Sequence, residues 1–325
     1  MLHYLIRKIL YSVPILIGVN LITFMLFFIV NTPDDMARIH LGDKRISKEQ
    51  IVQWKQTHGY DKPLFFNENA EGKEKLLNTL FISESIKLFS FNFGQSDYGR
   101  NIVSDIKQRM WPSLSIAVPT LLLGLLINIS LSLLMIFFRG TYLDHAGIVI
   151  CIILTSISVL FYIIVGQFLF AKIFKWFPVS GYRDGILSLK FVVLPVIVAV
   201  ISSIGTDTRW YRTLFLEEMH KEYVTTARAK GLSEFVILFK HILKNAMLPI
   251  LTGVIMVLPY LFMGSLLLES FFGIPGLGSY TIDAITQQDF AIVRSMVFIG
   301  SLLYIIGLVM TDIAYTIVDP RVRFS

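Results

Sequence analysis

The sequence has little cysteine and little charge. Its 325 residues include one cysteine, Cys151, so the chain cannot form a disulfide framework or a cysteine-based zinc site on its own. Charged residues make up 16% of the chain, whereas soluble domains average about 25%. Apolar residues make up 54% and the mean hydropathy is +0.67. This composition is typical of a membrane protein. Cys151 lies in an apolar run, where we expect a small buried side chain rather than a reactive thiol.

Motifs for nucleotide or metal chemistry are also missing from the sequence. It contains no G-x-x-x-x-G-K-[ST] loop to hold phosphates and no H-E-x-x-H motif. The six histidines are scattered, whereas metal sites need clustered ligands. They are His3, His40, His58, His145, His220 and His241. We therefore predict a non-catalytic chain with no metal and no cofactor of its own.

The net charge of +6 has two interpretations. It could indicate nucleic-acid binding, but in a membrane protein lysine and arginine collect in the cytoplasmic loops. We favour the second interpretation and expect no nucleic acid. Arg7 and Lys8 precede an apolar run that resembles a signal peptide. That run reaches Val30, beyond the length of a signal sequence, and no cleavage site follows, so we predict a membrane helix.

Six apolar stretches are close to the roughly 20 residues that cross a bilayer. They are Ile9–Val30, Ser113–Phe138, Ala146–Ala171, Phe191–Thr206, Ala246–Leu268 and Ser295–Val318. The fourth stretch is short and is expected to include Ile186–Leu189 as well. The prediction is an all-α protein with six transmembrane helices. Residues 1–30 hold the N-terminus and first helix, residues 31–111 a polar segment, and residues 112–325 a five-helix core.

Basic residues in the connections predict the orientation. The loop 207–245 carries seven, more lie at both ends of the chain, and Glu269–Ile292 carries none. This places both termini and the loop 207–245 in the cytoplasm. The connection Lys172–Lys190 carries four basic residues and argues against this topology. Arg294 and Glu269 flank the outer loop and are expected at the membrane interface.

The segment Asn31–Trp111 is too polar to enter the membrane. Its twelve basic and eleven acidic residues nearly balance, and such long loops do not follow the charge rule. We expect helices near Ser47–Thr57 and Glu71–Phe89. The segment is predicted to be a small extracytoplasmic cap rather than an independent domain.

The stretch Glu217–Pro249 is the most informative loop. Glutamates early and basic residues late predict a helix over Glu217–Lys230. Gly231 fits the position after a helix C-terminus. A second, interfacial helix is predicted over Glu234–Asn245. Such a pair could transmit force from a soluble partner, or it could be a solvated connector, and periodicity does not separate these alternatives.

Two further features carry functional hypotheses. Asp312 is the clearest charge inside an apolar stretch, so it is either functional or a residue that reaches the interface. Phe272–Ile285 is rich in glycine and could fold back towards the membrane, or it could be an ordinary tight loop.

Several motifs together resemble one family of membrane proteins. TTARAKG lies at Thr225–Gly231 and is followed by Leu248 and Pro249, which resembles the loop signature of bacterial ABC importer permeases. EYVTTARAKGLSE and HILKNAMLP are similar to the dipeptide, oligopeptide and nickel permeases. GIPGLGSYTIDAI at Gly273–Ile285 and DPRVRF at Asp319–Phe324 fit the same family. Thr225 stands where the general motif has glutamate, and Thr226 where it has alanine.

The resemblance implies a type I importer permease fold and assigns roles to residues. The helix Glu217–Lys230 would dock into a cytoplasmic ATPase, with Met219, Tyr223 and Ala227 along its docking face. The implied coupling residues are Met219, Glu222, Tyr223, Thr226, Ala227 and Gly231. The implied outer gate is formed by Gly273, Pro275, Gly276 and Gly278.

The resemblance also implies the partners of the chain. They are a homologous second permease that makes a heterodimer, two ATPase subunits that bind ATP and Mg²⁺, and a periplasmic binding protein. The location is the bacterial inner membrane and the cargo is peptides, with nickel or a peptide-like compound as the alternative. Two other classes stay open: an ion-coupled secondary transporter and a membrane sensor.

Overall fold

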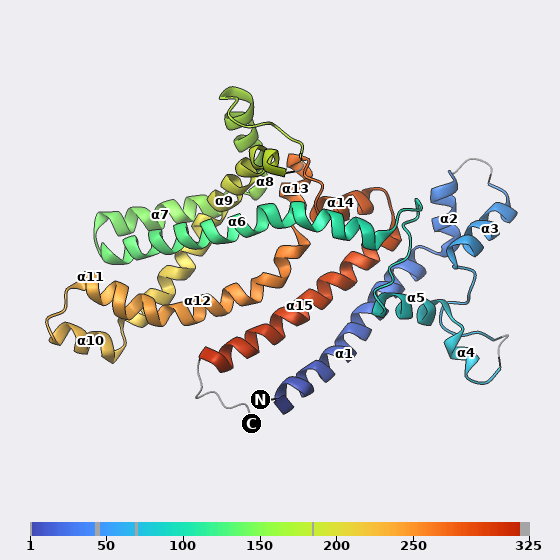
Figure 1. Ribbon diagram of the computed structural model, residues 1–325, viewed down its shortest axis with the longest axis horizontal. Helices are drawn as coiled ribbons and strands as arrows, with labels where there is room; N and C mark the ends of the chain where they lie inside the picture. Colours follow the sequence, from blue (N-terminus) through green and yellow to red (C-terminus); the bar gives the residue numbers. More distant parts are fainter. Residues whose placement is uncertain (1, 43–45, 69–70, 184, 319–325) are drawn as a thin grey trace. The chain divides into compact units, whose positions relative to one another are not determined.

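The computed structural model describes residues 2–42, 46–68, 71–183 and 185–318 (Figure 1). Within these ranges the secondary structure is helical, with no strand and one isolated bridge between Gln95 and Asn101. The predicted all-α class is confirmed. Contacts group the described residues into two compact units, those within 2–108 with 280–309 and those within 109–279 with 310–318. Residues 280–309 thus group with the N-terminal part of the chain, and the three regions predicted from the sequence stay a prediction.

The first unit begins with α1 (Leu2–Met25), which continues into a π-helical turn, η1 (Leu26–Val30). Four short helices follow: α2 (Pro33–Leu41), α3 (Lys48–His58), α4 (Glu74–Leu77) and α5 (Leu80–Phe89). Side-chain caps explain several of their boundaries. Thr32 with Asp35, and Ser47 with Gln50, form reciprocal capping boxes at the starts of α2 and α3.

The helix predicted near Ser47–Thr57 is therefore confirmed as α3. The one predicted over Glu71–Phe89 is wrong as a single helix. The chain is extended at Thr79, whose hydroxyl caps α5, and this splits the stretch into α4 and α5.

Three long helices carry three of the remaining apolar stretches: α6 (Ile102–Phe137), α9 (Leu189–Met219) and α15 (Phe290–Val318). The second unit contains shorter elements between them. These are α7 (Tyr142–Ser156), α8 (Val159–Gly166) with η2 (Gln167–Ile173), η3 (Gly185–Ser188), α10 (Glu222–Ala229), α11 (Glu234–Val236) with η4 (Ile237–Ile242), α12 (Leu243–Val257) with η5 (Leu258–Met263), and α13 (Leu266–Phe272). Helix α14 (Leu277–Thr286) begins in the second unit and ends in the first.

Five helices of the described chain are long and apolar enough to cross a membrane, and a bent pair would make a sixth. The chain is a multi-pass membrane protein. The bent pair is α7 with α8 and η2, which meet at 90°. A straight third helix over Ala146–Ala171 is therefore a wrong prediction. Ile157 is extended and the Ser158 hydroxyl accepts the N–H of Phe161 at 3.4 Å, so a new helix starts there.

The fourth and fifth spans also differ from their predicted bounds. Helix α9 does not stop at Thr206 but continues to Met219, through the first third of the predicted loop. The fifth span runs from Glu234 to Met263, so no separate interfacial helix exists over Glu234–Asn245. It ends before Leu268 because Gly264 adopts a φ of 70°.

The polar segment of the first unit shares its core with the end of the first span. Phe24 and Phe28 of that span pack with Met36, Trp54 and Leu80. This supports a cap that depends on the first span. Arg294 is buried in the protein: it donates to Glu84 and lies 5.4 Å from the ring centre of Phe28. Its predicted place at the membrane interface stays a prediction.

In the second unit, α7 packs along α9 (Figure 1). Arg212 donates two hydrogen bonds, of 3.1 and 2.9 Å, to the Asp144 carboxylate. Gly205 allows the close crossing, since a Cβ there would lie 2.5 Å from the Cys151 carbonyl oxygen. Cys151 is buried as predicted.

Candidate functional site

The loop between α9 and α12 contains a short helix, α10, set off by a break. Helix α9 ends at Met219, and Lys221 is extended before α10 starts at Glu222. A single helix over Glu217–Lys230 is therefore a wrong prediction. Lys221 and Tyr223 both donate to the Glu218 carboxylate, at 2.5 and 2.7 Å, and so hold the break in one shape. Burial and the neighbouring Glu218 raise the pKa of Tyr223 to about 12.

Helix α10 ends at a glycine, as the sequence predicts. Gly231 has a φ of 79°. Its N–H donates to Arg228 at 2.9 Å, and the N–H of Leu232 donates to Ala227 at 3.3 Å, which is a Schellman motif. Arg228 bridges the turn through two hydrogen bonds to Glu234, of 2.7 and 3.1 Å. The turn into the fifth span is thus fixed by backbone and side-chain contacts together.

One face of α10 is buried inside the chain. Val224 and Ala227 belong to an apolar cluster, hereafter the loop core, built from α6, α9, α10, η4 and α12. Met219 and Tyr223 pack against the same cluster. Ala227 is buried in the loop core, whereas Tyr223, and Met219 at the end of α9, are half-buried against it. Docking of an ATPase on these three residues stays a prediction.

The opposite face of α10 is exposed. It consists of Glu222, Thr225, Thr226 and Ala229, hereafter the outer face of α10. Glu222 and Thr226 were predicted site residues, whereas Thr225 and Ala229 were missed. The sequence contains a signal for this exposed face. Val224 and Ala227 are an apolar i, i+3 pair and lie on one side of the helix, so the polar residues on the opposite side are expected to face outwards.

The second site, the outer loop, joins α13 to α14. Gly273 has a φ of 63° and ends α13 in a second Schellman motif, with bonds from Gly273 to Ser270 and from Ile274 to Glu269. Pro275 and Gly276 then form the short link to α14. The predicted loop residues therefore make a compact helix–turn–helix rather than an open loop.

A buried carboxylate organises this turn. Glu269 is fully buried and accepts the N–H of Ser265 at 3.1 Å, of Gly278 at 2.7 Å and of Ser279 at 3.1 Å. It therefore caps the N-termini of both α13 and α14. Burial raises the pKa of Glu269, although these hydrogen bonds oppose the effect. The three N–H donors of Glu269 cannot be recognised in the sequence, and its predicted place at the membrane interface stays a prediction.

Two of the predicted glycines permit this packing. A Cβ on Gly276 would collide with the Glu269 carboxylate, and one on Gly278 would lie 2.6 Å from the Ser265 carbonyl carbon. The Ser113 hydroxyl accepts the N–H of Leu277 at 2.8 Å and attaches the turn to α6. The turn between α13 and α14 is thus closely packed and is hydrogen-bonded to α6 within the second unit.

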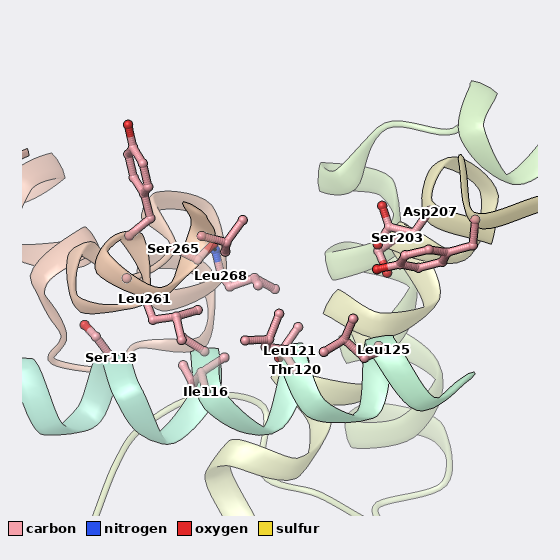
Figure 2. Close-up of a pocket in the computed structure, with 16 residues that line it drawn as sticks. Ser113, Ile116, Thr120, Leu121, Leu125, Ser203, Asp207, Leu261, Ser265 and Leu268 are labelled. Atoms are coloured by element: carbon pink, nitrogen blue, oxygen red, sulfur yellow. The ribbon is translucent and has the colours of Figure 1, made fainter. Parts of the chain in front are cut away.

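A pocket of about 310 Å³ lies in the second unit beside this loop. Its walls come from α6, α9, the end of α12, η5 and α13 (Figure 2). Most lining side chains are apolar, including Ile116, Leu121, Leu125, Leu261 and Leu268. Sequence analysis could not identify these residues, because lining a pocket depends on how distant helices pack.

Two predicted features remain to be placed. Asp312 lies on α15 and is half-buried. The motif at 319–324 lies outside the described residues. The partial burial of Asp312 is compatible with either hypothesis for it.

Two family models together match most of the chain. Residues 128–324 match the family described as binding-protein-dependent transport system inner membrane component. Residues 1–112 match the N-terminal part of such membrane components. The first match contains the α9–α12 loop and the outer loop, so both candidate sites fall within it.

Curated relatives of this chain match it from end to end. It is 28% identical to a probable peptide ABC transporter permease protein of Sinorhizobium fredii, over 99% of both chains. It is 27% identical to an oligopeptide transport system permease protein of Bacillus subtilis, over 100% of both chains. It is 26% identical to a di/tripeptide transport system permease protein of Pseudomonas aeruginosa, over 99% of both.

Proposed function

Because the chain belongs to the family of binding-protein-dependent transport system inner membrane components, we propose that it is a permease subunit of an ATP-driven peptide importer. The cargo is inferred from relatives named as permeases for peptides, oligopeptides or di- and tripeptides. The subunit is non-catalytic in this proposal, and ATP and Mg²⁺ bind to its ATPase partners.

The single observation that carries the coupling role is the two-sided character of α10. Its inner face is anchored in the loop core, which includes residues of α6, α9 and α12. Its outer face presents small and polar side chains, which permit close approach by a groove of another protein. A push on this face would move α6, α9 and α12 together, because packed interiors transmit displacement rather than absorb it.

The remaining parts of the assembly follow from this role. We place the chain in a bacterial inner membrane with both termini and α10 in the cytoplasm. It pairs with a homologous second permease, two ATPase subunits dock on the cytoplasmic side, and a periplasmic binding protein delivers cargo at the outer loop. Gly273, Pro275, Gly276 and Gly278 hold the shape of that loop as an outer gate. Asp312 contributes an intramembrane charge near the cytoplasmic end of α15.

Co-purification and uptake test the proposal. The tagged chain, expressed with its neighbouring genes, should elute with two ATPase subunits and a second permease. In proteoliposomes with the binding protein, it should import radiolabelled trialanine only when ATP is present. A chain that elutes alone and drives uptake with an ion gradient would contradict the proposal. Uptake of a nickel chelate instead of trialanine would support the importer function and would change the proposed cargo from peptides to nickel.

A further inference from the structure

A buried polar cluster joins α6 and α9 inside the membrane-spanning part of the second unit. Asn128 donates through its amide nitrogen to the Ser203 hydroxyl at 3.1 Å and to the Asp207 carboxylate at 3.2 Å. Its carbonyl accepts the Thr208 hydroxyl at 3.4 Å. Asn128 and Thr208 are fully buried. Asn128 therefore uses both of its N–H groups and its oxygen, and it fixes the position of Asp207.

Asp207 has only neutral neighbours in this cluster. The Asn128 amide donates to its carboxylate, and the neutral Ser203 hydroxyl lies beside it. Among the side chains that the structure describes, no basic group lies within ion-pair distance of it, and Arg212 on the same helix is engaged by Asp144. A carboxylate on a membrane-spanning helix without a counter-ion is costly, and such residues mark the paths of substrates and ions.

The same carboxylate lines the pocket beside the outer loop. In Figure 2, Asp207 and Ser203 lie at one end of the pocket, with Ser113 and Ser265 at the other. The wall between these ends contains Leu121 and Leu125. Thr120 also lines the pocket, and its hydroxyl oxygen is buried with no hydrogen-bond partner in the described residues. The pocket thus offers one carboxyl group within a largely apolar wall.

We propose that Asp207 binds the ammonium group of a substrate passing through this pocket. This inference rests on the proposed function, and it narrows the substrate class to compounds with a primary ammonium group. Every unblocked peptide carries one at its N-terminus, whatever its side chains. The apolar wall would accept varied side chains, while the carboxylate would fix the orientation of the chain.

Chemical labelling tests the site without transport. An apolar carbodiimide modifies carboxyl groups inside membranes, and mass spectrometry measures modification at Asp207 in the assembled transporter. Trialanine amide at millimolar concentration should lower this modification at least threefold. N-acetyltrialanine amide has the same bulk and no ammonium group, and it should leave the modification unchanged. Equal effects of the two peptides, or no effect of either, would overturn the proposal. An absence of any effect from either peptide is expected if a basic side chain of a partner subunit occupies the site.

Peptide uptake by Asp207 variants tests the ammonium site independently of labelling. Asp207→Asn keeps the size and most hydrogen bonds of the side chain, and it should lower ATP-driven uptake of trialanine at least tenfold. Asp207→Glu retains the charge and should keep at least a third of wild-type uptake. Both variants should co-purify with the ATPase subunits in wild-type amounts. Wild-type uptake by Asp207→Asn would refute the site. If the wild-type transporter does not import trialanine at all, the peptide function fails, and the labelling experiment still decides the ammonium site.

Discussion

His40 is a buried titratable residue in the polar segment of the first unit. Its Nε2 lies 3.4 Å from the Asp97 carboxylate, and the two side chains are 6% and 3% exposed. Asp97 also accepts the N–H of Phe290 at 3.1 Å. The neighbouring Asp97 carboxylate, with a smaller contribution from Asp289, raises the pKa of His40 above 6.5 against the effect of burial. The protonated imidazolium therefore stabilises this segment.

This ion pair predicts a pH-dependent stability. A raised pKa in the folded state means that the stabilisation is complete below pH 6.5 and is lost as the pH rises through the folded-state pKa of His40. Thermal unfolding of the purified chain should shift to lower temperature over that window. His40→Gln should remove the shift, and Asp97→Asn should reduce it. An unchanged pH profile in His40→Gln would contradict this assignment.

Gly278 illustrates a second constraint at the scale of one residue. An added Cβ would lie 2.6 Å from backbone atoms of Ser265, and backbone cannot yield as a flexible side chain can. Gly278→Ala should therefore destabilise the chain by about 1–3 kcal/mol, as overpacking usually does. Differential scanning fluorimetry in detergent measures the effect. Gly18→Ala is the matched control, since nothing lies within 4 Å of its added Cβ, and it should leave the melting temperature unchanged or raise it.

At the scale of single helices, α10 has one buried face and one exposed face. Its eight residues could not form a stable helix alone in water. Lys221, the Schellman motif at Gly231 and the burial of Val224 and Ala227 stabilise it. The outer face is left unconstrained by the chain's own packing and so is open to a partner.

The reactivity of single cysteine substitutions can measure how accessible each face of α10 is. In a Cys151→Ala background, Thr226→Cys should react with a maleimide at least tenfold faster than Ala227→Cys, which is 5% exposed. In the assembled transporter the reaction of Thr226→Cys should slow, because the ATPase would cover it. Equal rates for the two positions would contradict the burial of Ala227. Unchanged reactivity of Thr226→Cys on assembly would contradict docking at the outer face.

At the scale of the whole molecule, the number of crossings depends on the bent pair of α7 with α8 and η2. The 90° bend leaves two possibilities, a broken span or a re-entrant pair. Between Asp61 and Lys230 the chain passes through α6, the bent pair and α9. Six crossings place these two exposed residues on opposite sides of the membrane, and five place them on the same side.

Labelling of intact cells distinguishes the two topologies. We expect six crossings, so a membrane-impermeant maleimide should label Asp61→Cys in intact cells, and Lys230→Cys only after permeabilisation. The Cys151→Ala parent, which lacks any thiol, is the control for background. Labelling of both positions from the same side would show that the bent pair does not cross.

The amino-acid sequence by itself determined the membrane character, the approximate positions of the long helices and the glycine that ends α10. Each of these depends on local properties: the mean hydropathy of about 20 residues, or the ability of Gly231 to adopt a positive φ. Such properties can be read without knowing which distant residues pack nearby. The family motifs at Thr225–Gly231 and Gly273–Ile285 are likewise contiguous.

Only the tertiary structure decided which faces are buried and which polar groups meet. The burial of Ala227 depends on η4 and α12 as well as on its own helix. Glu269 finds its three N–H donors only because α13 and α14 fold onto each other. Asp207 meets Asn128 across 79 residues of sequence. The physical reason is the same in each case: a polar or small side chain is satisfied by partners that the packing of separate helices brings to it.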